Sequence, residues 1–150
     1  MLQVGEKAPG FHATTDAGED FELSDFRGRV VILYFYPKDD TPGCTKEACD
    51  FRDSYEAILR KGAVLIGCSA DPATSHEKFK SKYSLPFPLV ADESHEICNA
   101  YGVWQEKKMY GKSHMGIVRT TFIIDPKGNI SHRFDKVKVE GHVDEILGKV

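Results

Sequence analysis

The sequence contains little cysteine and no paired C-x-x-C unit. Its four cysteines are separated by four, eighteen and twenty-nine residues, and they are Cys44, Cys49, Cys68 and Cys98. These spacings match neither a zinc ribbon nor a plant-type iron–sulfur protein. They also give no disulfide scaffold of the kind that stabilises small secreted proteins. We therefore expect no metal or other cofactor, and we expect any disulfide to be transient and catalytic.

Long apolar runs and blocks of like charge are also missing. No segment reaches the roughly 20 apolar residues that a membrane-spanning helix needs, and residues 1–7 lack the pattern of a signal peptide. The 20 basic and 23 acidic residues are spread along the chain, which gives no electrostatic footprint for nucleic acid or an anionic membrane. The composition predicts a soluble cytoplasmic protein whose partners are small molecules or other proteins.

The apolar pattern predicts strands that alternate with helices. A continuous β-branched and aromatic run over 29–36 indicates a strand buried on both faces, and hence a central one. Residues 11–14 and 21–23 flank a turn with Gly18 and predict an N-terminal hairpin that forms a lid or edge. Further strands are expected at 63–69, 86–91, 120–124 and 129–134, and helices at 42–60, 72–83, 93–101 and 143–147. This order predicts one α/β domain over residues 1–150, with a mixed sheet.

The helix predicted to begin near residue 42 carries two of the four cysteines. Thr41 has a hydroxyl available to cap this helix, and Pro42 suits its first position, where a missing N–H has no consequence. Cys44 would lie in the first turn, where unpaired N–H groups and the helix dipole favour an anion. A thiolate is therefore the expected species.

Helical geometry separates the two cysteines of this helix. At 100° per residue, Cys44 shares a buried stripe with Ala48, Phe51, Tyr55, Ile58 and Leu59. Cys49 lies about 140° from Cys44 and is expected to face solvent, with the two Cα atoms about 8.7 Å apart. That separation exceeds the roughly 7 Å that a disulfide allows without backbone movement. If the two cysteines bond, the start of the helix must unwind.

The residues alone leave more than one interpretation of this pair. One treats Cys44 as a small core hydrophobe and Cys49 as an incidental surface residue. The other treats them as a nucleophile and its resolving partner, and it is favoured because an exposed free cysteine is otherwise disfavoured. Two further redox functions stay open: a disulfide exchanger, although that class uses C-x-x-C, and a redox-switched binding protein whose helix unwinds on oxidation.

The loop before this helix resembles the active-site loop of the peroxiredoxins. Residues 37–44, Pro-Lys-Asp-Asp-Thr-Pro-Gly-Cys, match the P-x-x-x-T-x-x-C pattern of that family. With 44–49, Cys-Thr-Lys-Glu-Ala-Cys, the chain resembles the bacterioferritin comigratory protein branch, also called the Q-type peroxiredoxins. Similar stretches at 23–28, 91–95, 101–104 and 116–125 extend the resemblance over nearly the whole chain. It implies a thioredoxin-like fold with a central mixed sheet flanked by helices and an added N-terminal β-hairpin.

The resemblance also implies a reaction. Cys44 would be the peroxidatic cysteine, which attacks hydrogen peroxide or an organic hydroperoxide and becomes a sulfenic acid. Cys49 would be the resolving cysteine, which closes an intramolecular disulfide that thioredoxin or a similar dithiol then reduces. Because both cysteines belong to one chain, the reaction does not require a dimer, and we expect a monomer.

Other residues would form the peroxide site that the resemblance implies. Thr41 would hold the peroxide through its hydroxyl, and Arg119 would stabilise the thiolate and the departing oxygen. The backbone N–H groups of Gly43 and Cys44 would complete the polar site, and Pro37 would shield the thiol from water.

Four further residues lie outside this assigned site. Glu47 fits either a contact that orients Arg119 or a role on the helix surface. Cys68 and Cys98 lie in apolar contexts and are expected to be packed thiols that turnover does not need. Trp104 fits a core position or a surface near the active site.

Overall fold

A five-stranded mixed sheet forms the centre of the computed structural model, which describes residues 1–150 except for the side chain of Met109. The strands lie in the order β5 (Leu89–Ala91), β4 (Val64–Ser69), β3 (Val31–Phe35), β8 (Thr120–Ile124) and β9 (Ile130–Asp135). β3 pairs in parallel with β4 and antiparallel with β8. Every residue of β3 is buried, which confirms the expected central strand in a mixed sheet.

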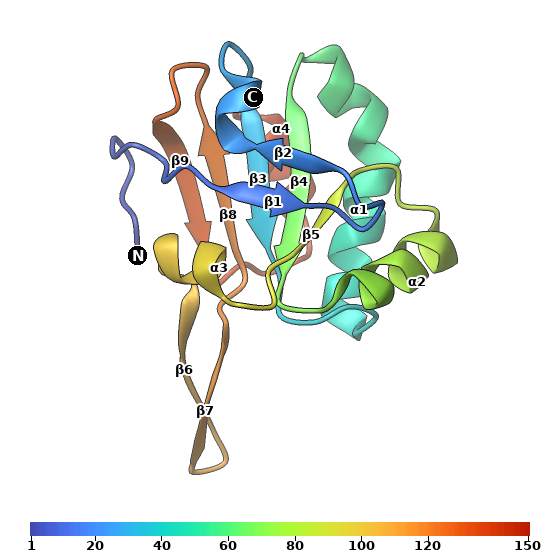
Figure 1. Cartoon of the computed structure of the whole chain (residues 1–150), viewed down its shortest axis with the longest axis vertical. Coiled ribbons are helices and arrows are strands. Elements are labelled where there is room, and N and C mark those ends of the chain that lie inside the picture. The colour runs from blue at the N-terminus through green and yellow to red at the C-terminus, as the bar shows by residue number, and fades with distance from the viewer.

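Helices and one hairpin pack around this sheet, and a second hairpin extends away from it (Figure 1). The helices are α1 (Pro42–Arg60), α2 (Ala73–Tyr83), α3 (Glu96–Ala100) and α4 (His142–Leu147), with a short 3-10 helix, η1 (Leu23–Phe26). The hairpins are β1 (His12–Thr14) with β2 (Asp20–Glu22), and β6 (Trp104–Met109) with β7 (Lys112–Ile117). Among the described residues, no helix is both long and apolar enough to cross a membrane.

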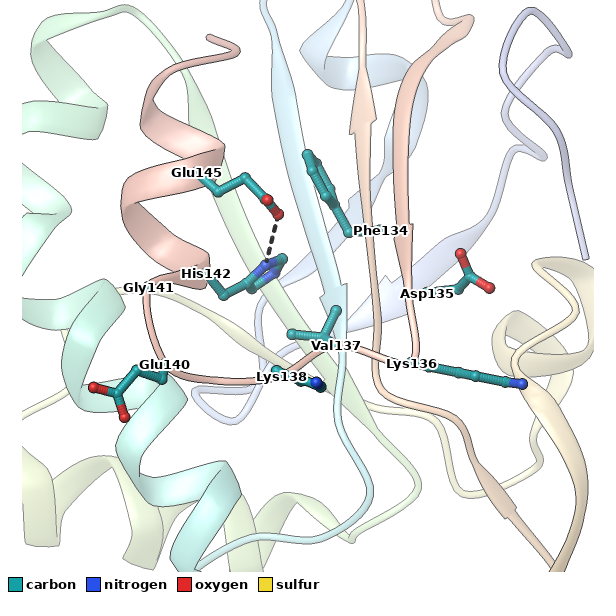
Figure 2. Close-up of a pocket in the computed structure, with 9 residues that line it drawn as sticks. All are labelled: Phe134, Asp135, Lys136, Val137, Lys138, Glu140, Gly141, His142 and Glu145. Atoms are coloured by element: carbon teal, nitrogen blue, oxygen red, sulfur yellow. Dashed lines mark ion pairs between the residues drawn. The ribbon is translucent and has the colours of Figure 1, made fainter.

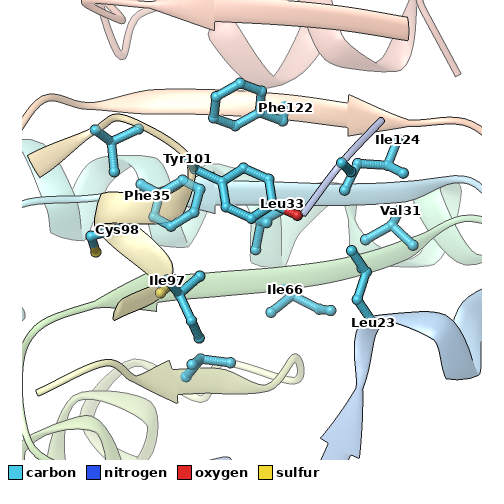
Figure 3. Packing of buried hydrophobic residues seen from close by; sticks show 14 of the residues in the cluster. Leu23, Val31, Leu33, Phe35, Ile66, Ile97, Cys98, Tyr101, Phe122 and Ile124 are labelled. Carbon is cyan, nitrogen blue, oxygen red and sulfur yellow. The ribbon is translucent and has the colours of Figure 1, made fainter. Parts of the chain in front are cut away.

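The two faces of the sheet bury separate hydrophobic clusters. Successive side chains of a strand point to opposite faces, so Leu33 and Phe35 lie on one side of β3, and Ile32 and Tyr34 lie on the other. The cluster of Leu33 includes residues of α3 and of the β1–β2 hairpin, and Figure 3 shows Tyr101 and Phe122 among its members. The cluster of Tyr34 includes residues of α1, α2 and α4. Cys44 belongs to this second cluster, so the candidate nucleophile faces the sheet.

The elements follow the expected order, and some are shorter than expected. α1 has the predicted bounds, and Gly62 follows it with the positive φ of 76° that a glycine after a helix commonly adopts. β5 begins only at Leu89, after two prolines that cannot donate a hydrogen bond to a neighbouring strand. α3 begins at Glu96 and not at 93, because His95 has a left-handed backbone with a φ of 65°.

The β6–β7 hairpin was not predicted. It projects away from the body of the molecule in Figure 1, and residues 112–115 of its second strand are exposed. A strand that packs on no core needs no alternation of apolar and polar residues, so the hydrophobic pattern gave no signal. The signal was its turn: Tyr110 and Gly111 both have positive φ, as a two-residue hairpin turn of type I′ requires.

Candidate active site

The first turn of α1 carries Cys44 at its third position. Thr41 is the extended residue that precedes the helix, and Pro42 and Gly43 are its first two residues. The Thr41 hydroxyl was expected to cap this helix, but it donates a hydrogen bond to the carbonyl of Lys38 at 2.9 Å. That bond closes a turn within the loop, so the Thr41 side chain makes no capping hydrogen bond to the helix. The N–H groups of the first turn therefore remain available to an anion.

Arg119 reaches Cys44 from the segment between β7 and β8. The Cys44 side chain is 2 % exposed, and Nη2 of Arg119 donates a hydrogen bond to its Sγ at 3.3 Å. Gly43 makes this approach possible, because a Cβ at this position would lie 3.1 Å from Nη2 of Arg119. The guanidinium thus lies against both the thiol and the first turn of α1. A positive charge at this place stabilises a thiolate and any negative charge that develops beside it.

Glu47 lies on the other side of the Arg119 guanidinium. Its side chain is fully buried, and Oε1 accepts a hydrogen bond from Nη1 of Arg119 at 2.7 Å. The structure therefore places Glu47 against Arg119 and not on the helix surface, the alternative that the sequence left open. Helical periodicity in the sequence indicates this position, because three residues along a helix turn by 300° and bring Glu47 within 60° of Cys44. The guanidinium is held between a carboxyl group and the sulfur.

Burial changes the acidity of Glu47. It raises the pKa of this carboxyl group to about 7, although the charge and hydrogen bond of Arg119 act to lower it. Oε2 of Glu47 and the hydroxyl of Tyr34 are buried without a hydrogen-bond partner among the described groups. Burial also raises the pKa of Tyr34 well above its usual value, with the charges of Glu47 and Cys44 adding to the effect. Glu47 thus ionises near neutral pH in a site that hardly solvates its charge.

Replacing Glu47 by glutamine is expected to stabilise the protein at high pH. A raised folded-state pKa gives a contribution to stability that is complete below the unfolded value of about 4.5 and is lost as pH rises through about 7. The loss is on the order of 3 kcal/mol, and glutamine removes it while keeping an acceptor for Arg119. Denaturant unfolding at about pH 5 and about pH 8 measures this difference. The prediction would be contradicted if the difference in free energy of unfolding between wild type and variant were the same at both pH values.

Cys49 lies further along α1, which continues without a break past both cysteines. All four cysteines are free thiols, and Cys49 is half-buried, whereas a solvent-facing position was expected. An intact helix keeps the Cα atoms of Cys44 and Cys49 about 8.7 Å apart, beyond the span of a disulfide. Pro37 is half-buried at the start of the loop, and its shielding of the thiol stays a prediction.

The buried stripe of α1 agrees with the helical geometry except at its end. The buried members of the helix are Cys44, Glu47, Ala48, Phe51 and Ile58. Leu59 was expected among them but is 47 % exposed, because it lies at the margin of the stripe in the last turn. Tyr55 is half-buried.

The other two cysteines lie on the opposite face of the sheet. Cys68 and Cys98 are fully buried in the cluster of Leu33, in which Figure 3 labels Cys98, whereas Cys44 projects from α1 into the cluster on the other face. Burial raises the pKa of Cys68 well above its usual value, with the contact to Cys98 adding to the effect, so its thiol stays protonated. Asp92 completes a group of three potential metal ligands, but its two oxygens accept hydrogen bonds from the N–H groups of Ile97 and Cys98. This group has the features of packing and not of a nucleophilic site.

Trp104 begins β6 and is half-buried. Its ring stacks on that of His95, with 3.9 Å between centroids. The structure thus places it at the base of the projecting hairpin, between the core and the surface.

A separate pocket lies between the end of β9 and α4 (Figure 2). Its lining residues are Phe134, Asp135, Lys136, Val137, Lys138, Glu140, Gly141, His142 and Glu145. His142 hydrogen-bonds the Thr121 hydroxyl at 2.8 Å, and burial lowers its pKa. The lining includes none of Thr41, Cys44 and Arg119, so this pocket is distinct from the site at the start of α1.

Comparison with known proteins identifies the family of this chain. Residues 4–133 match the AhpC/TSA family. The chain is 52% identical over 149 residues to a putative peroxiredoxin bcp of Coxiella burnetii, with 99% of each protein covered. It is 50% identical over 146 residues to peroxiredoxin Bcp of Bacillus subtilis, covering 97% of this chain and 93% of that one. Both similarities extend far beyond the cysteine motif.

Solved structures show the same fold. A cysteine mutant of PrxQ from Xylella fastidiosa superposes with a TM-score of 0.94 at 34% identity, over 99% of this chain and 95% of that one. The bacterioferritin comigratory protein of Xanthomonas campestris gives 0.89 at 39% identity, over 93% and 88%. The expected thioredoxin-like fold is thereby confirmed. The chain therefore belongs to the AhpC/TSA family as a peroxiredoxin of the Q-type, or bacterioferritin comigratory, branch, and it is an enzyme that reduces peroxides with a thiol.

Proposed function

We propose that this peroxidase reduces hydrogen peroxide and organic hydroperoxides through Cys44 and resolves the product with Cys49. The observation that carries the proposal is the hydrogen bond of 3.3 Å from Nη2 of Arg119 to Sγ of Cys44, in the first turn of α1. A neighbouring cation and free backbone N–H groups are the surroundings that activate a cysteine as a nucleophile. The study of the Xanthomonas campestris relative concerns its alkyl peroxide reduction activity, which supports organic hydroperoxides as substrates here.

The first step transfers one oxygen atom to sulfur. The Cys44 thiolate attacks the terminal oxygen of the hydroperoxide, the O–O bond breaks, and the leaving oxygen takes a proton to become water or an alcohol. The sulfur is oxidised to a sulfenic acid while the peroxide is reduced by two electrons. The N–H groups of Gly43 and Cys44 and the Arg119 guanidinium are the donors that we assign to the two peroxide oxygens. The Thr41 hydroxyl donates its hydrogen to the Lys38 carbonyl, so we assign it as the acceptor of the peroxide O–H. Pro37 limits the access of water to the thiol.

The second step forms a disulfide and requires the start of α1 to open. The Cys49 thiol attacks the sulfenic sulfur, an S–S bond forms, and water leaves. Because an intact helix holds the two Cα atoms too far apart, the segment 42–50 unwinds in each cycle. A dithiol such as thioredoxin then reduces the disulfide by thiol–disulfide exchange and is itself oxidised.

The reaction needs only one chain. We infer that residues 1–150 form one domain, since both hydrophobic clusters pack on the same five-stranded sheet. We also infer that the protein is a monomer and that it works in the cytoplasm, where a thioredoxin system keeps thiols reduced.

One equivalent of hydrogen peroxide added to the fully reduced protein tests the proposed disulfide. We expect each chain to lose two thiols and no disulfide to form between chains. Trypsin cleaves after Lys46, between the two cysteines, so mass spectrometry should find the peptides of Cys44 and Cys49 joined by a disulfide. A bond from Cys44 to Cys68 or Cys98, or one between chains, would overturn the assignment of Cys49.

A further inference from the structure

A buried polar cluster attaches the active-site loop to α2. His76 of α2 is fully buried, and its Nδ1 lies 2.7 Å from Oδ2 of Asp39, in the loop between Pro37 and Thr41. Its other ring nitrogen, Nε2, lies 2.9 Å from the carbonyl oxygen of Val90 in β5. None of these groups contacts Cys44 in the described hydrogen bonds, so the reaction assigned above does not use them directly.

The partners of this imidazole indicate its protonation state. The carbonyl of Val90 only accepts, so Nε2 carries a hydrogen. Asp39 accepts hydrogen bonds from the Tyr36 hydroxyl at 2.6 Å and from the Ser75 hydroxyl at 2.8 Å, so both of its oxygens act as acceptors. A carboxylic acid is a stronger acid than an imidazolium, so the shared proton lies on Nδ1. His76 is therefore an imidazolium paired with the Asp39 carboxylate in the core.

The cluster fixes the loop from several elements. The backbone N–H of Asp39 donates a hydrogen bond to Oδ2 of Asp71, which follows β4. Asp71 is held in turn by the Ser69 hydroxyl at 2.7 Å. A second, exposed attachment joins the same loop to the far end of α2, where Asp40 accepts hydrogen bonds from Lys82 and the Tyr83 hydroxyl, each at 2.8 Å. The loop is thus bound to α2 at a buried point and at a surface point.

We propose that His76 is a positioning residue for peroxide reduction, because its buried ion pair with Asp39 holds the loop that carries Thr41 and the first turn of α1. Asp39 lies two residues before Thr41 and five before Cys44. The pair therefore anchors the chain just before α1, so that unwinding of the helix does not extend back into the loop. It also biases the protein toward the state in which Cys44 faces Arg119. The catalytic part of this inference rests on the proposed function.

The pair predicts a pH dependence with a defined sign. Burial lowers the pKa of His76, but the hydrogen bond and charge of Asp39, the Val90 carbonyl and the charge of Asp71 outweigh it and raise the pKa above its usual value. Stabilisation by the pair is complete below the unfolded value of about 6.5 and is lost as pH rises through the raised one. Burial holds the pKa of Tyr36 well above its usual value, so its hydroxyl stays a donor over this range.

Nuclear magnetic resonance of the imidazole nitrogens tests the ion pair in the wild-type protein without peroxide. At about neutral pH, where an ordinary histidine is mostly neutral, His76 should show both ring nitrogens protonated. As pH rises and this signature disappears, amide exchange over residues 37–46 should accelerate more than the intrinsic exchange rate does. Two results would overturn the ion pair whether or not the peroxidase mechanism is correct. One is a neutral His76 at neutral pH, and the other is an amide exchange rate over residues 37–46 that does not change as His76 titrates.

Two variants test the positioning role. His76→Gln keeps a donor but removes the charge, and it should raise the exchange rate over 37–46 about a hundredfold. In a Cys49→Ser background it should also slow the reaction of Cys44 with hydrogen peroxide about tenfold. In the single variant His76→Gln, which retains Cys49, disulfide formation should not slow, because that step needs the opened helix. Lys82→Gln weakens only the exposed attachment, since the Tyr83 hydroxyl still donates to Asp40, and it should change each rate by less than about twofold.

The outcomes separate positioning from general destabilisation. His76→Ala, which removes the donor toward Asp39 as well as the charge, should slow the peroxide reaction more than His76→Gln does. Equal slowing of the peroxide reaction and of disulfide formation by His76→Gln would overturn the positioning role, as would equal effects of His76→Gln and Lys82→Gln. If His76→Gln does not fold, the pH titration of exchange in the wild-type protein decides the inference.

Discussion

Replacing Cys44 by serine is expected to abolish hydroperoxide turnover, whereas replacing Cys49 should leave a single turnover. A serine hydroxyl at position 44 is not ionised at neutral pH and cannot accept the peroxide oxygen as a sulfur does. Cys49→Ser keeps the nucleophile but leaves its sulfenic acid unresolved. Steady-state consumption of hydrogen peroxide with a thioredoxin system compares the two variants with the wild-type protein.

The buried thiols provide matched controls for this comparison. Cys68→Ala and Cys98→Ala each remove a thiol from the far face of the sheet, so they should cost stability and leave turnover per folded molecule unchanged. In Cys49→Ser, a sulfenic acid probe should label Cys44 after one equivalent of peroxide. Full turnover by Cys44→Ser would show that another residue is the nucleophile. Undiminished recycling in Cys49→Ser would show that the dithiol attacks Cys44 directly.

Arg119→Ala should slow peroxide reduction by about 100- to 1000-fold, as removal of one preorganised donor does in other active sites. The guanidinium donates to Sγ of Cys44 at 3.3 Å and to Oε1 of Glu47 at 2.7 Å. Its loss removes the donor nearest to the reacting sulfur and also leaves a buried carboxyl group without its partner. Single-turnover kinetics of the reduced protein measure the effect on the first step.

Thiolate formation alone cannot account for a change of this size. A free thiol with a pKa of about 8.5 is roughly 3% ionised at neutral pH, and lowering its pKa to about 6 raises the thiolate fraction some thirtyfold. Nucleophilicity falls by about tenfold over the same interval, so only a few-fold advantage remains. Alignment of the O–O bond and stabilisation of the leaving oxygen must supply the rest.

The prediction for Arg119 therefore compares two measurements. Thiolate absorbance gives the ionised fraction of Cys44 in each protein, and the rate per thiolate is then compared. Arg119→Lys keeps the charge but lacks the planar fork that places one nitrogen against the sulfur and another against the carboxyl group, so its rate should lie between those of wild type and Arg119→Ala. If the rate per thiolate is unchanged in Arg119→Ala, ionisation explains the whole effect and the role in transition-state stabilisation is wrong.

Local patterns in the sequence determined much of the fold. The all-apolar run of β3 specified a central strand, and Pro42 together with the stripe of α1 specified a helix that begins just before Cys44. The cysteine spacing on that helix also implied that a disulfide requires unwinding. These features involve residues close together in the chain, so propensity, capping and periodicity describe them. The roles of Thr41 and Arg119 came from the family resemblance and not from these patterns.

Only the tertiary structure decided what surrounds the sulfur. Arg119 is 75 residues from Cys44, and it arrives there because β8 pairs with β3, with Thr120 opposite Phe35. The same packing turns Glu47 from a possible surface residue into a buried partner of Arg119, and it joins Asp39 to His76. Contacts between residues far apart in the chain depend on strand pairing and helix packing, which local patterns do not encode. The sequence alone thus indicated the candidate nucleophile, and the packed sheet supplied the groups that surround it.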